Sequence, residues 1–414
     1  MAQRITLVLF NLLLFIGTQS AWAQSFNGKT PPTLLDNILR SSKTLLPVIE
    51  NKDKFRTQII YSRISKDSKG EIVLTHYSFN VHENSYFYPA SLVKLPLSIF
   101  AIEKISGLKS LGVSLESKLS IDSNYTCQKT VTQDLLSNDH IPSVKNYITK
   151  ALIVSDNASY NRLFEFVNPG YCEQRLSELG FNNARIISRF SSCDSTENRH
   201  TNSFKFYNDS NDVIYEQPTQ FFEKKYSPPF QNMKVGAAHY SNGKVVKGAK
   251  DFSKSNCFPL QDMHDLLISL VYPETSKLTF SLSAENRNFL LKCLSSSPQE
   301  SEIIPIVTNP VYNEFMTNYL YYGAQKKVIR NPNLKIYNIV GQSYGFLSDI
   351  SYFQDTQNNI EFFLSAVIYA NSSEVVGNGG YQYETVGFPF LQDLGKTIYK
   401  FELNDKKENE KEAN

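Results

Sequence analysis

The chain has 414 residues, 41% of them hydrophobic and 20% charged, and its formal net charge is +2 at pH 7. This length and apolar content allow one large domain or two, and the near-neutral charge gives no indication of a nucleic-acid or acidic-membrane partner. The five cysteines contain no Cys-x-x-Cys pair and the six histidines no His-Glu-x-x-His motif, so we expect no metal site and no cofactor. The cysteines allow at most two disulfides, whose connectivity the sequence leaves open.

The first residues predict a secretory signal peptide. An early arginine precedes a short apolar run, and the small-x-small sequence "AWA" follows it. We therefore expect cleavage after Ala23 and export, so that the mature chain is secreted or periplasmic. The alternative is an uncleaved anchor helix, but the apolar run is short for a membrane span.

The next elements alternate between helix and strand patterns. Residues 33–50 have helical apolar spacing, and "FRTQIIYSRIS" and "EIVLTHYSFNV" are rich in β-branched and aromatic residues. The turn-forming "KDSKG" between these two segments predicts a β-hairpin. A helix is expected to begin near Ser91. Further helical patterns then run to about residue 180, in "TVTQDLLSN", "VKNYITKALIVS", "NASYNRLFEFV" and "CEQRLSELG".

Residues 190–256 are polar and non-periodic, apart from a predicted hairpin around Asn242-Gly243. The lysines of this hairpin are typical of a solvated face, although they are also compatible with an anionic glycan ligand. Two helical segments follow, "LQDMHDLLISLVYPE" and "SAENRNFLLKCLSSS", and then three predicted strands, "KIYNIVGQSYG", "LSDISYFQD" and "IEFFLSAVIYA". The segment "FPFLQDLGKTIYKFEL" predicts a closing helix, and we expect the charged tail to be disordered.

This order predicts an α+β fold in which two N-terminal and three C-terminal strands form one five-stranded antiparallel sheet flanked by helices. An all-helical part is expected to be inserted between the two groups of strands. The predicted boundaries are 1–23 for the signal peptide, 24–402 for one domain, 30–100 plus 325–402 for its α/β part, 101–324 for its helical part with an insertion at 203–256, and 403–414 for the tail.

Ser91 and Lys94 lie three residues apart before an apolar run. At a helix start, the serine lies near N–H groups that favour negative charge, and the lysine shares its helix face. A partly desolvated lysine there can accept the serine proton, which makes the serine a nucleophile. The alternative is a capping serine beside a surface lysine, because Ser-x-x-Lys also occurs at Ser106/Lys109 and Ser241/Lys244.

Two further segments offer groups that suit acyl transfer. Ser155-Asp156-Asn157 occurs once, 64 residues after Ser91, where a polar turn can present a hydroxyl and an amide. The alternative is an ordinary helix N-cap, for which these residue types are favoured. In "NIVGQSYGFLSDISYF", Gly341 lies within a predicted strand, where a glycine often marks the close approach of a ligand or of backbone.

In this order, the three segments resemble the class A β-lactamase and penicillin-binding protein superfamily, whose motifs are S-x-x-K, S-D-N and K-T-G. The resemblance spans residues 35–402 and implies a single β-lactamase/transpeptidase-like fold and a monomer. It implies that Ser91 is acylated, with Lys94 as its base and Ser155 as the proton relay to the leaving nitrogen. It also implies that Asn157 binds the substrate amide, and that Gly341 and Gln342 line the site, with the N–H groups of Ser91 and Gln342 as the oxyanion hole.

The chain departs from the third motif because Ile339-Val340-Gly341 stands where Lys-Thr-Gly is expected. In the superfamily, that lysine helps to bind the substrate carboxylate, which an isoleucine cannot do. Lys335 lies four residues earlier, about 13 Å away along a strand, which is too far for a simple replacement. Arg330 and Arg199 are the other conceivable replacements.

The resemblance also implies a deacylating glutamate on a loop after the second motif. The segment "STENRHTN" offers Glu197, 42 residues after Ser155, although a surface role for this residue is equally compatible with the sequence.

Three functions therefore remain open. The first is an exported serine hydrolase acting on a β-lactam or a D-alanyl peptide of peptidoglycan. The second is a non-catalytic cell-envelope binding protein with the same fold, and the third is an esterase or amidase with an unrelated substrate.

Overall fold

A computed structural model describes residues 33–82, 84–224, 226–326 and 328–412. The predicted signal peptide lies outside these residues. Within them, no helix is both long enough and apolar enough to cross a membrane.

One five-stranded antiparallel sheet is built from both ends of the described chain, as predicted. The N-terminal hairpin joins the C-terminal meander where β1 pairs with β12, with Tyr61 opposite Leu364. In spatial order, the strands are β10 (Leu334–Ser343), β11 (Phe346–Asp355), β12 (Ile360–Tyr369), β1 (Gln58–Lys66) and β2 (Ile72–Phe79). Strand β10 is therefore an edge strand, whose outer backbone groups are available to a ligand.

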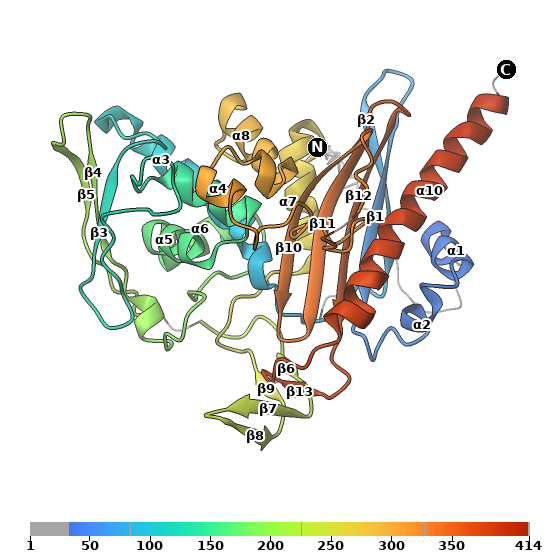
Figure 1. The fold of residues 1–414 in the computed structure, drawn as a ribbon, viewed down its shortest axis with the longest axis horizontal. Coiled ribbons are helices and arrows are strands. Elements are labelled where there is room, and N and C mark those ends of the chain that lie inside the picture. The colour runs from blue at the N-terminus through green and yellow to red at the C-terminus, as the bar shows by residue number, and fades with distance from the viewer. Residues whose placement is uncertain (1–32, 83, 225, 327, 413–414) are drawn as a thin grey trace, which may run out of the picture.

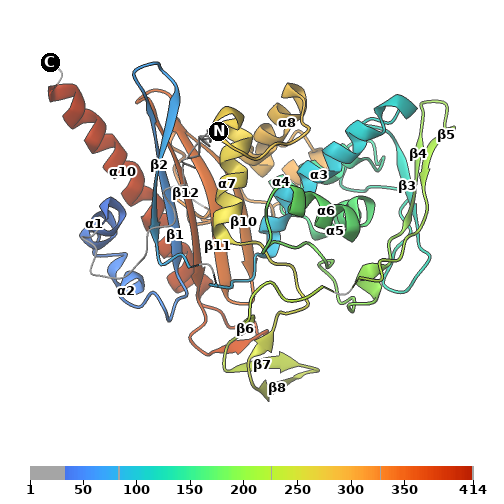
Figure 2. The same ribbon diagram turned by 180° about the vertical axis from the view of Figure 1, so that it is seen from behind.

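Helices cover both faces of this sheet because alternate strand residues are apolar on each face. Val340 and Leu364 belong to the core beneath α1 (Leu34–Ser41), α2 (Leu46–Ile49) and α10 (Phe388–Glu412). Ile339 and Phe363 belong to the core beneath α7 (Leu260–Val271) and α8 (Ala284–Ser295). Figures 1 and 2 show α10 and α7 on opposite faces of the sheet.

The part of the chain between the two groups of strands packs beside β10 (Figure 1). Besides α7 and α8, its helices are η1 (Ala90–Val93), α3 (Lys94–Gly107), η2 (Lys109–Leu111), α4 (Val144–Ile153), α5 (Asn157–Val167), α6 (Pro169–Glu178), η3 (Glu197–Arg199), η4 (Pro273–Thr275), η5 (Pro298–Glu300) and α9 (Ile304–Val307). A π-helical turn, η6 (Tyr383–Gly387), leads into α10.

The expectation that this part is all-helical is wrong, because its described residues contribute strands to three small sheets, one of which also takes a strand from residues 375–376. The segment "TVTQDLLSN" is a series of turns, and residues 203–217 form a hairpin that their polar turn residues concealed. The hairpin predicted around Asn242-Gly243 is present, and both residues have positive φ, as a tight hairpin turn requires. The strands are β3 (Leu119–Asp122), β4 (Ser203–Tyr207), β5 (Val213–Gln217), β6 (Lys234–Val235), β7 (Ala238–Ser241), β8 (Lys244–Lys247), β9 (Lys250–Asp251) and β13 (Val375–Val376).

The charged tail also differs from the expectation, because α10 continues through residues 403–412. Arg63 of β1 forms ion pairs with Glu402 and Asp405 of this helix, at 3.0 Å and 2.6 Å. The Lys406 ammonium lies 3.9 Å from the carboxylate of Glu410, one helical turn further along. Charges spaced at helical intervals therefore support the helix beyond its apolar part.

Candidate active site

Ser91 and Lys94 lie at the junction of η1 and α3, next to the edge strand β10. The residue before the serine, Ala90, has a φ of 47°, a conformation that a non-glycine residue keeps only when its surroundings impose it. The Lys94 ammonium donates a hydrogen bond of 2.9 Å to the Ser91 hydroxyl. The Ser-x-x-Lys spacing therefore produces a direct contact between the two side chains.

Lys94 is fully buried, with none of its surface exposed. Its Nζ also lies 2.5 Å from the Ser155 carbonyl oxygen, 3.0 Å from the Ser155 hydroxyl and 2.9 Å from the Asn157 side-chain oxygen, so its three N–H groups are shared among four oxygen atoms. Burial lowers the pKa of Lys94 from 10.5 to about 7, against an opposing contribution from the negative charge of Asp156. A substantial fraction of Lys94 is therefore neutral at pH 7 and can accept a proton from Ser91.

The Ser155-Asp156-Asn157 turn joins α4 to α5 and brings its side chains to Lys94. Asp156 is the N-cap of α5 and accepts a hydrogen bond of 2.6 Å from the Ser159 N–H. Ser155 has a φ of 55°, which turns its hydroxyl and carbonyl toward the lysine. Because Lys94 holds the side-chain oxygen of the exposed Asn157, the amide NH₂ of this residue is left to donate to a substrate.

Strand β10 lies against η1 at Gly341, where the chain leaves no room for a side chain. A Cβ at this position would lie 2.4 Å from the Pro89 carbonyl oxygen and 2.6 Å from the Ser348 hydroxyl oxygen. The glycine predicted from the strand pattern is therefore required by close packing between β10 and the segment that carries Ser91.

The direction of the Gln342 N–H follows from the register of the β10–β11 hairpin. Strands β10 and β11 are joined by Tyr344-Gly345, both with positive φ, and Ser343 is paired with Phe346. In a two-residue hairpin, that first pair exchanges hydrogen bonds, so the N–H of the next residue points away from the partner strand. Because β10 is the edge strand, the Gln342 N–H is directed out of the sheet, on the side where an oxyanion donor is expected.

Ile339 is buried in the core, and neither of the two arginines considered as replacements for the missing lysine is free to serve. Arg330 forms ion pairs with Glu300 and Glu314, at 2.9 Å and 2.6 Å. Arg199 donates to backbone carbonyls, among them Glu223 at 3.0 Å. The ammonium of Lys335 lies 5.0 Å from the centre of the Tyr337 ring on the outer part of β10.

A residue that the sequence did not indicate, Phe190, covers Lys94. Its ring centre lies 5.4 Å from the lysine Nζ and 4.1 Å from the ring centre of Tyr160. Its N–H donates to the side chain of Asn161 at 2.8 Å. The wall of the site beside the lysine is therefore an aromatic ring, and Phe190 lay undetected in a polar segment without periodicity.

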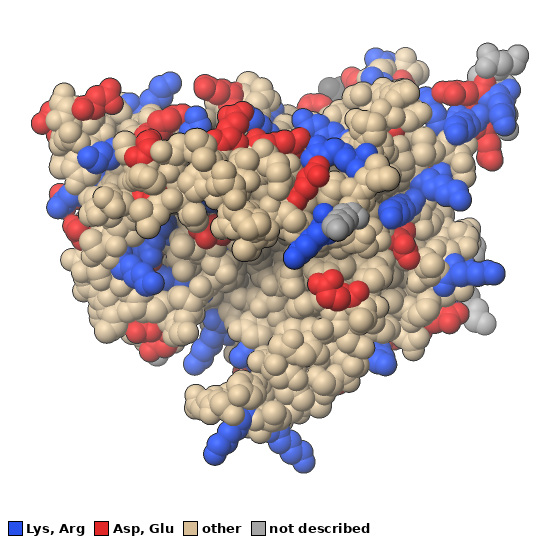
Figure 3. Space-filling view, viewed as in Figure 1, with Lys and Arg blue, Asp and Glu red and all other residues tan. Residues whose placement is uncertain are grey.

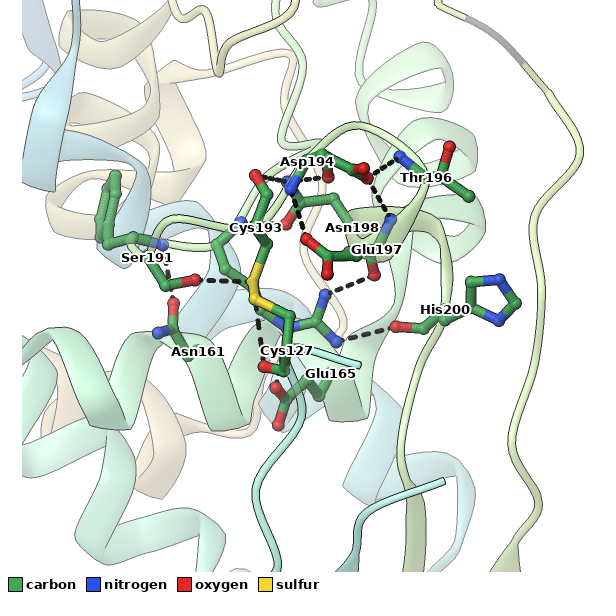
Figure 4. The surroundings of a disulfide bond; sticks show 12 residues. Cys127, Asn161, Glu165, Ser191, Cys193, Asp194, Thr196, Glu197, Asn198 and His200 are labelled. Atoms are coloured by element: carbon green, nitrogen blue, oxygen red, sulfur yellow. Dashed lines mark hydrogen bonds and ion pairs between the residues drawn. A yellow bond between two sulfur atoms is a disulfide. The ribbon is translucent and has the colours of Figure 1, made fainter. Parts of the chain in front are cut away.

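The loop that carries Phe190 is fixed by a buried charge network. Glu165, which is 1% exposed, pairs with Arg162 at 2.6 Å and with Arg189 at 2.8 Å. Arg189 also donates to the carbonyls of Glu197 and His200, at 3.0 Å and 2.8 Å. The side chain of Arg189, at the start of the loop 189–200, therefore binds the end of the same loop and fixes its path (Figure 4).

Glu197 lies on this loop but is not brought to Lys94. Its carboxylate accepts a hydrogen bond of 2.7 Å from the Asp194 N–H, close to the disulfide between Cys127 and Cys193 (Figure 4). Among the described residues, the hydrogen-bond partners of the Lys94 ammonium include no carboxylate. The assignment of Glu197 as the deacylating base stays a prediction, and this geometry gives it no support.

The disulfide joins two loops that the sequence could not pair. It leaves three buried free cysteines, Cys172, Cys257 and Cys293. The ligand atoms of Cys127, Cys193 and Glu197 lie within 4.8 Å of one another. Because the two sulfurs are bonded to each other, they are not the thiolates that a metal ion would require.

Comparisons with known proteins concern the fold and part of the sequence. Residues 50–218, which include Ser91, Lys94, Ser155 and Asn157, match the sequence profile of the beta-lactamase enzyme family, Beta-lactamase2. A solved structure of a variant of the last common ancestor of Gram-negative class A β-lactamases, bound to a transition-state analogue, is similar over 89% of this chain and 99% of that chain. That similarity has a TM-score of 0.50 and an identity of 12%. The chain has the β-lactamase fold.

Two β-lactamases are similar over a comparable length. That of Desulfarculus baarsii is 12% identical, with 87% of this chain and 98% of that chain covered and a TM-score of 0.48. That of Vibrio parahaemolyticus is 11% identical, with the same coverage and TM-score. No curated protein sequence matches the chain. The resemblance inferred from the motifs is confirmed for the fold and for residues 50–218.

Within this β-lactamase fold, most of the predicted site residues come together. Ser91, Lys94, Ser155 and Asn157 form one hydrogen-bonded group. Gly341 and Gln342 border this group through the contact of β10 with η1. Glu197 stands apart, and Phe190 is the neighbour that was missed.

Proposed function

We propose that the chain is an exported serine hydrolase of the β-lactamase type, which opens a β-lactam or a related amide through an acyl-enzyme on Ser91. The observation that carries this proposal is the buried Lys94 ammonium, hydrogen-bonded to both Ser91 and Ser155. A lysine with a pKa of about 7 is matched to proton transfer at neutral pH. The contact of one buried lysine with two serine hydroxyls is the arrangement that proton transfer between these groups requires.

The contacts define the acylation step. Neutral Lys94 takes the proton of Ser91, whose oxygen attacks the substrate carbonyl carbon. The N–H groups of Ser91 and Gln342 stabilise the oxyanion that forms. Protonated Lys94 then returns its proton through the Ser155 hydroxyl to the leaving nitrogen. The carbon–nitrogen bond breaks, the ester on Ser91 remains, and the lysine is neutral again.

The substrate class follows from what this step needs. A β-lactam or a D-alanyl peptide offers an activated or specifically bound amide to a serine at this position. The buried Ile339 removes the cation that the superfamily uses for the substrate carboxylate, so the choice between these two substrates remains part of the proposal.

Export and a monomeric state complete the proposal. Residues 1–23 have the pattern of a secretory signal peptide, and a disulfide between Cys127 and Cys193 is typical of an oxidising compartment. Mass spectrometry of the processed protein tests this directly, with an N-terminus at residue 24 as the expected result.

The test of the activity is intact-protein mass spectrometry over time with benzylpenicillin. The wild type should gain the mass of the penicillin, and Ser91→Ala should gain nothing. Ser106→Ala is the matched control, because Ser106 belongs to another Ser-x-x-Lys pair and only donates to the Ile102 carbonyl, at 2.9 Å. An adduct on Ser91→Ala, or neither an adduct nor hydrolysed benzylpenicillin with the wild type, would refute acylation of Ser91 by this substrate.

Two observations favour a second candidate, a non-catalytic binding protein of the cell envelope. The site lacks the third-motif lysine, and Glu197 faces Asp194 rather than Lys94. Binding of cell-wall peptides by the wild type and by Ser91→Ala with equal affinity, without covalent modification, would support this alternative.

A further inference from the structure

The inserted residues 203–256 are attached directly to the candidate active site. Phe252, which is 1% exposed, inserts between two tyrosines, with ring-centre distances of 5.3 Å to Tyr88 and 5.2 Å to Tyr344. The two tyrosines contact each other edge to face at 5.1 Å. Tyr88 lies three residues before Ser91, and Tyr344 lies two residues after Gln342. The C-terminal end of the insertion therefore contacts both segments that carry the proposed oxyanion-hole N–H groups.

This attachment brings one lysine, Lys250, to the rim of the site. Lys250 begins β9 and lies opposite Val235, which is completely buried, so both residues are on the inner face of the two-stranded sheet. Its ammonium lies 5.2 Å from the ring centre of Tyr344 and 5.7 Å from that of Phe252. The aromatic faces hold the cation beside the end of β10.

Lys250 keeps its charge available. No ion pair joins it to a carboxylate in the described part of the chain. Its neighbour Asp251 lies opposite Lys234 on the other face of the two strands. The hydrogen bond from the Ser253 N–H lowers the pKa of Asp251, and the positive charge of Lys234 adds to this effect. Lys250 is also only partly exposed, unlike Lys244 and Lys247 of the β7–β8 hairpin.

The direction of a bound substrate along β10 follows from the two ends of the site. Ser155 must reach the leaving nitrogen, and its side of the site adjoins the earlier part of β10. There, Thr317 donates to the Ile153 carbonyl at 3.3 Å and accepts from Asn338 at 2.8 Å. The acyl part of the substrate must then extend the other way, past Gln342 toward Tyr344.

We propose that Lys250 recognises a carboxylate on the acyl part of the substrate, so that the enzyme prefers acidic acyl groups. This inference rests on the proposed acylation of Ser91 and adds a substrate preference to it. Lys250 lies at the end of β10 that the acyl part approaches, with its ammonium held on Tyr344. A carboxylate there would complete a charge pair at the rim, which acts mainly on the rate of association.

The test compares benzylpenicillin with carbenicillin, which carries one further carboxylate on the same acyl side chain. Second-order rates of acylation are measured by intact-protein mass spectrometry. Lys250→Met should slow acylation by carbenicillin about fivefold while leaving benzylpenicillin nearly unchanged. Lys247→Met is the matched control and should change neither rate, because this lysine is exposed on the β7–β8 hairpin. Figure 3 shows basic side chains pointing outward from the lowest part of the molecule, where that hairpin lies.

The possible results separate this inference from the proposed function. No acylation of the wild type by either compound would refute the proposed activity itself. Acylation with the same rate ratio in the wild type and in Lys250→Met would overturn the role of Lys250. If the variant fails to fold, the test is the ratio of the wild-type acylation rates with carbenicillin and benzylpenicillin at increasing salt. Screening by salt should remove a preference for carbenicillin. A ratio that is insensitive to salt would then refute the inference.

Discussion

In the proposed mechanism, the protonation state of Lys94 controls the nucleophile Ser91. Its protonated form donates to Ser91 and cannot accept the serine proton, whereas its neutral form can. Because the pKa of Lys94 is lowered to about 7, the rate of acylation should rise with pH and level off above that value. Below it, each pH unit should reduce the second-order rate with benzylpenicillin about tenfold. A pH-rate profile from pH 5 to pH 9 measures this.

Lys94→Arg provides the control, since arginine stays protonated throughout this range. This variant should react at least 100-fold more slowly than the wild type at pH 8, an estimate from the usual contribution of a general base of about 10²–10⁴. A wild-type profile without a rise between pH 6 and 8 would contradict a role for neutral Lys94.

Phe190 should make the acyl-enzyme long-lived. Its ring stands over Lys94, where a hydrolytic water would need a polar neighbour to orient it. Phe190→Glu places a carboxylate at this wall and should speed loss of the adduct at least about tenfold. It should also slow acylation at neutral pH, because a nearby negative charge raises the pKa of Lys94.

Phe190→Leu keeps the wall apolar and should leave the lifetime of the adduct close to that of the wild type. Mass spectra taken after removal of free benzylpenicillin give these lifetimes. Rapid loss of the adduct from the wild type would show that another group already activates water.

Among single residues, the sequence indicated those that lie close together in the chain and missed those that only the fold brings together. Ser91 and Lys94 share a helix face, so their contact could be predicted, whereas their approach to Ser155 depends on the whole helical part. Phe190 lies on an irregular loop and Lys250 on the two-residue strand β9, and no local pattern reveals what such short segments contact in space. Glu197 was chosen from a motif spacing, and its assignment stays a prediction, because its carboxylate accepts a hydrogen bond within its own disulfide-linked loop.

Among the secondary-structure elements, the contact between β10 and η1 is the most sensitive to substitution. Gly341→Ala would bring a Cβ within 2.4 Å of the Pro89 carbonyl, so β10 must shift away from the segment that carries Ser91. Moving the Gln342 N–H should lower the acylation rate about 100-fold, the effect of losing one oxyanion donor. Overpacking should also reduce the free energy of unfolding by about 2 kcal/mol.

Gly107→Ala is the matched control at the end of α3, the helix that begins at Lys94. A Cβ at Gly107 meets nothing within 4 Å. This variant should keep full acylation and be slightly more stable, by up to about 1 kcal/mol, because alanine favours helix. Acylation kinetics and urea unfolding measure both variants. Equal acylation rates for the two variants would contradict the close contact at Gly341.

The main elements could be predicted because their patterns are local. The strands of the large sheet are rich in β-branched and aromatic residues, and α4, α5 and α7 have apolar residues at helical spacing. The hairpin of β4 and β5 was missed because the turn between its short strands is a run of polar residues, 208–212, inside a segment without periodicity. The helical tail was missed because its support comes from Arg63, far away in the sequence.

Across the whole molecule, the order of the strands makes the chain one cooperative unit. Strands β1 and β12 pair, although the entire helical part lies between them in the sequence. The core that includes Ile60, Phe100 and Phe363 is shared between that part and the sheet. The helical part therefore cannot lose its packing without exposing a face of the sheet, and we expect both to unfold together.

Loss of the disulfide should consequently destabilise the entire chain rather than one loop. Cys127 and Cys193 are separated by 66 residues, and a crosslink of this span contributes about 4 kcal/mol in the chain-entropy account. The double variant Cys127→Ser/Cys193→Ser should unfold at lower urea concentration, in a single transition seen by both far-UV and near-UV circular dichroism. Dithiothreitol should lower the midpoint of the wild type similarly and leave that of the double variant unchanged. An effect of dithiothreitol on the double variant, or none on the wild type, would show that this bond does not stabilise the fold.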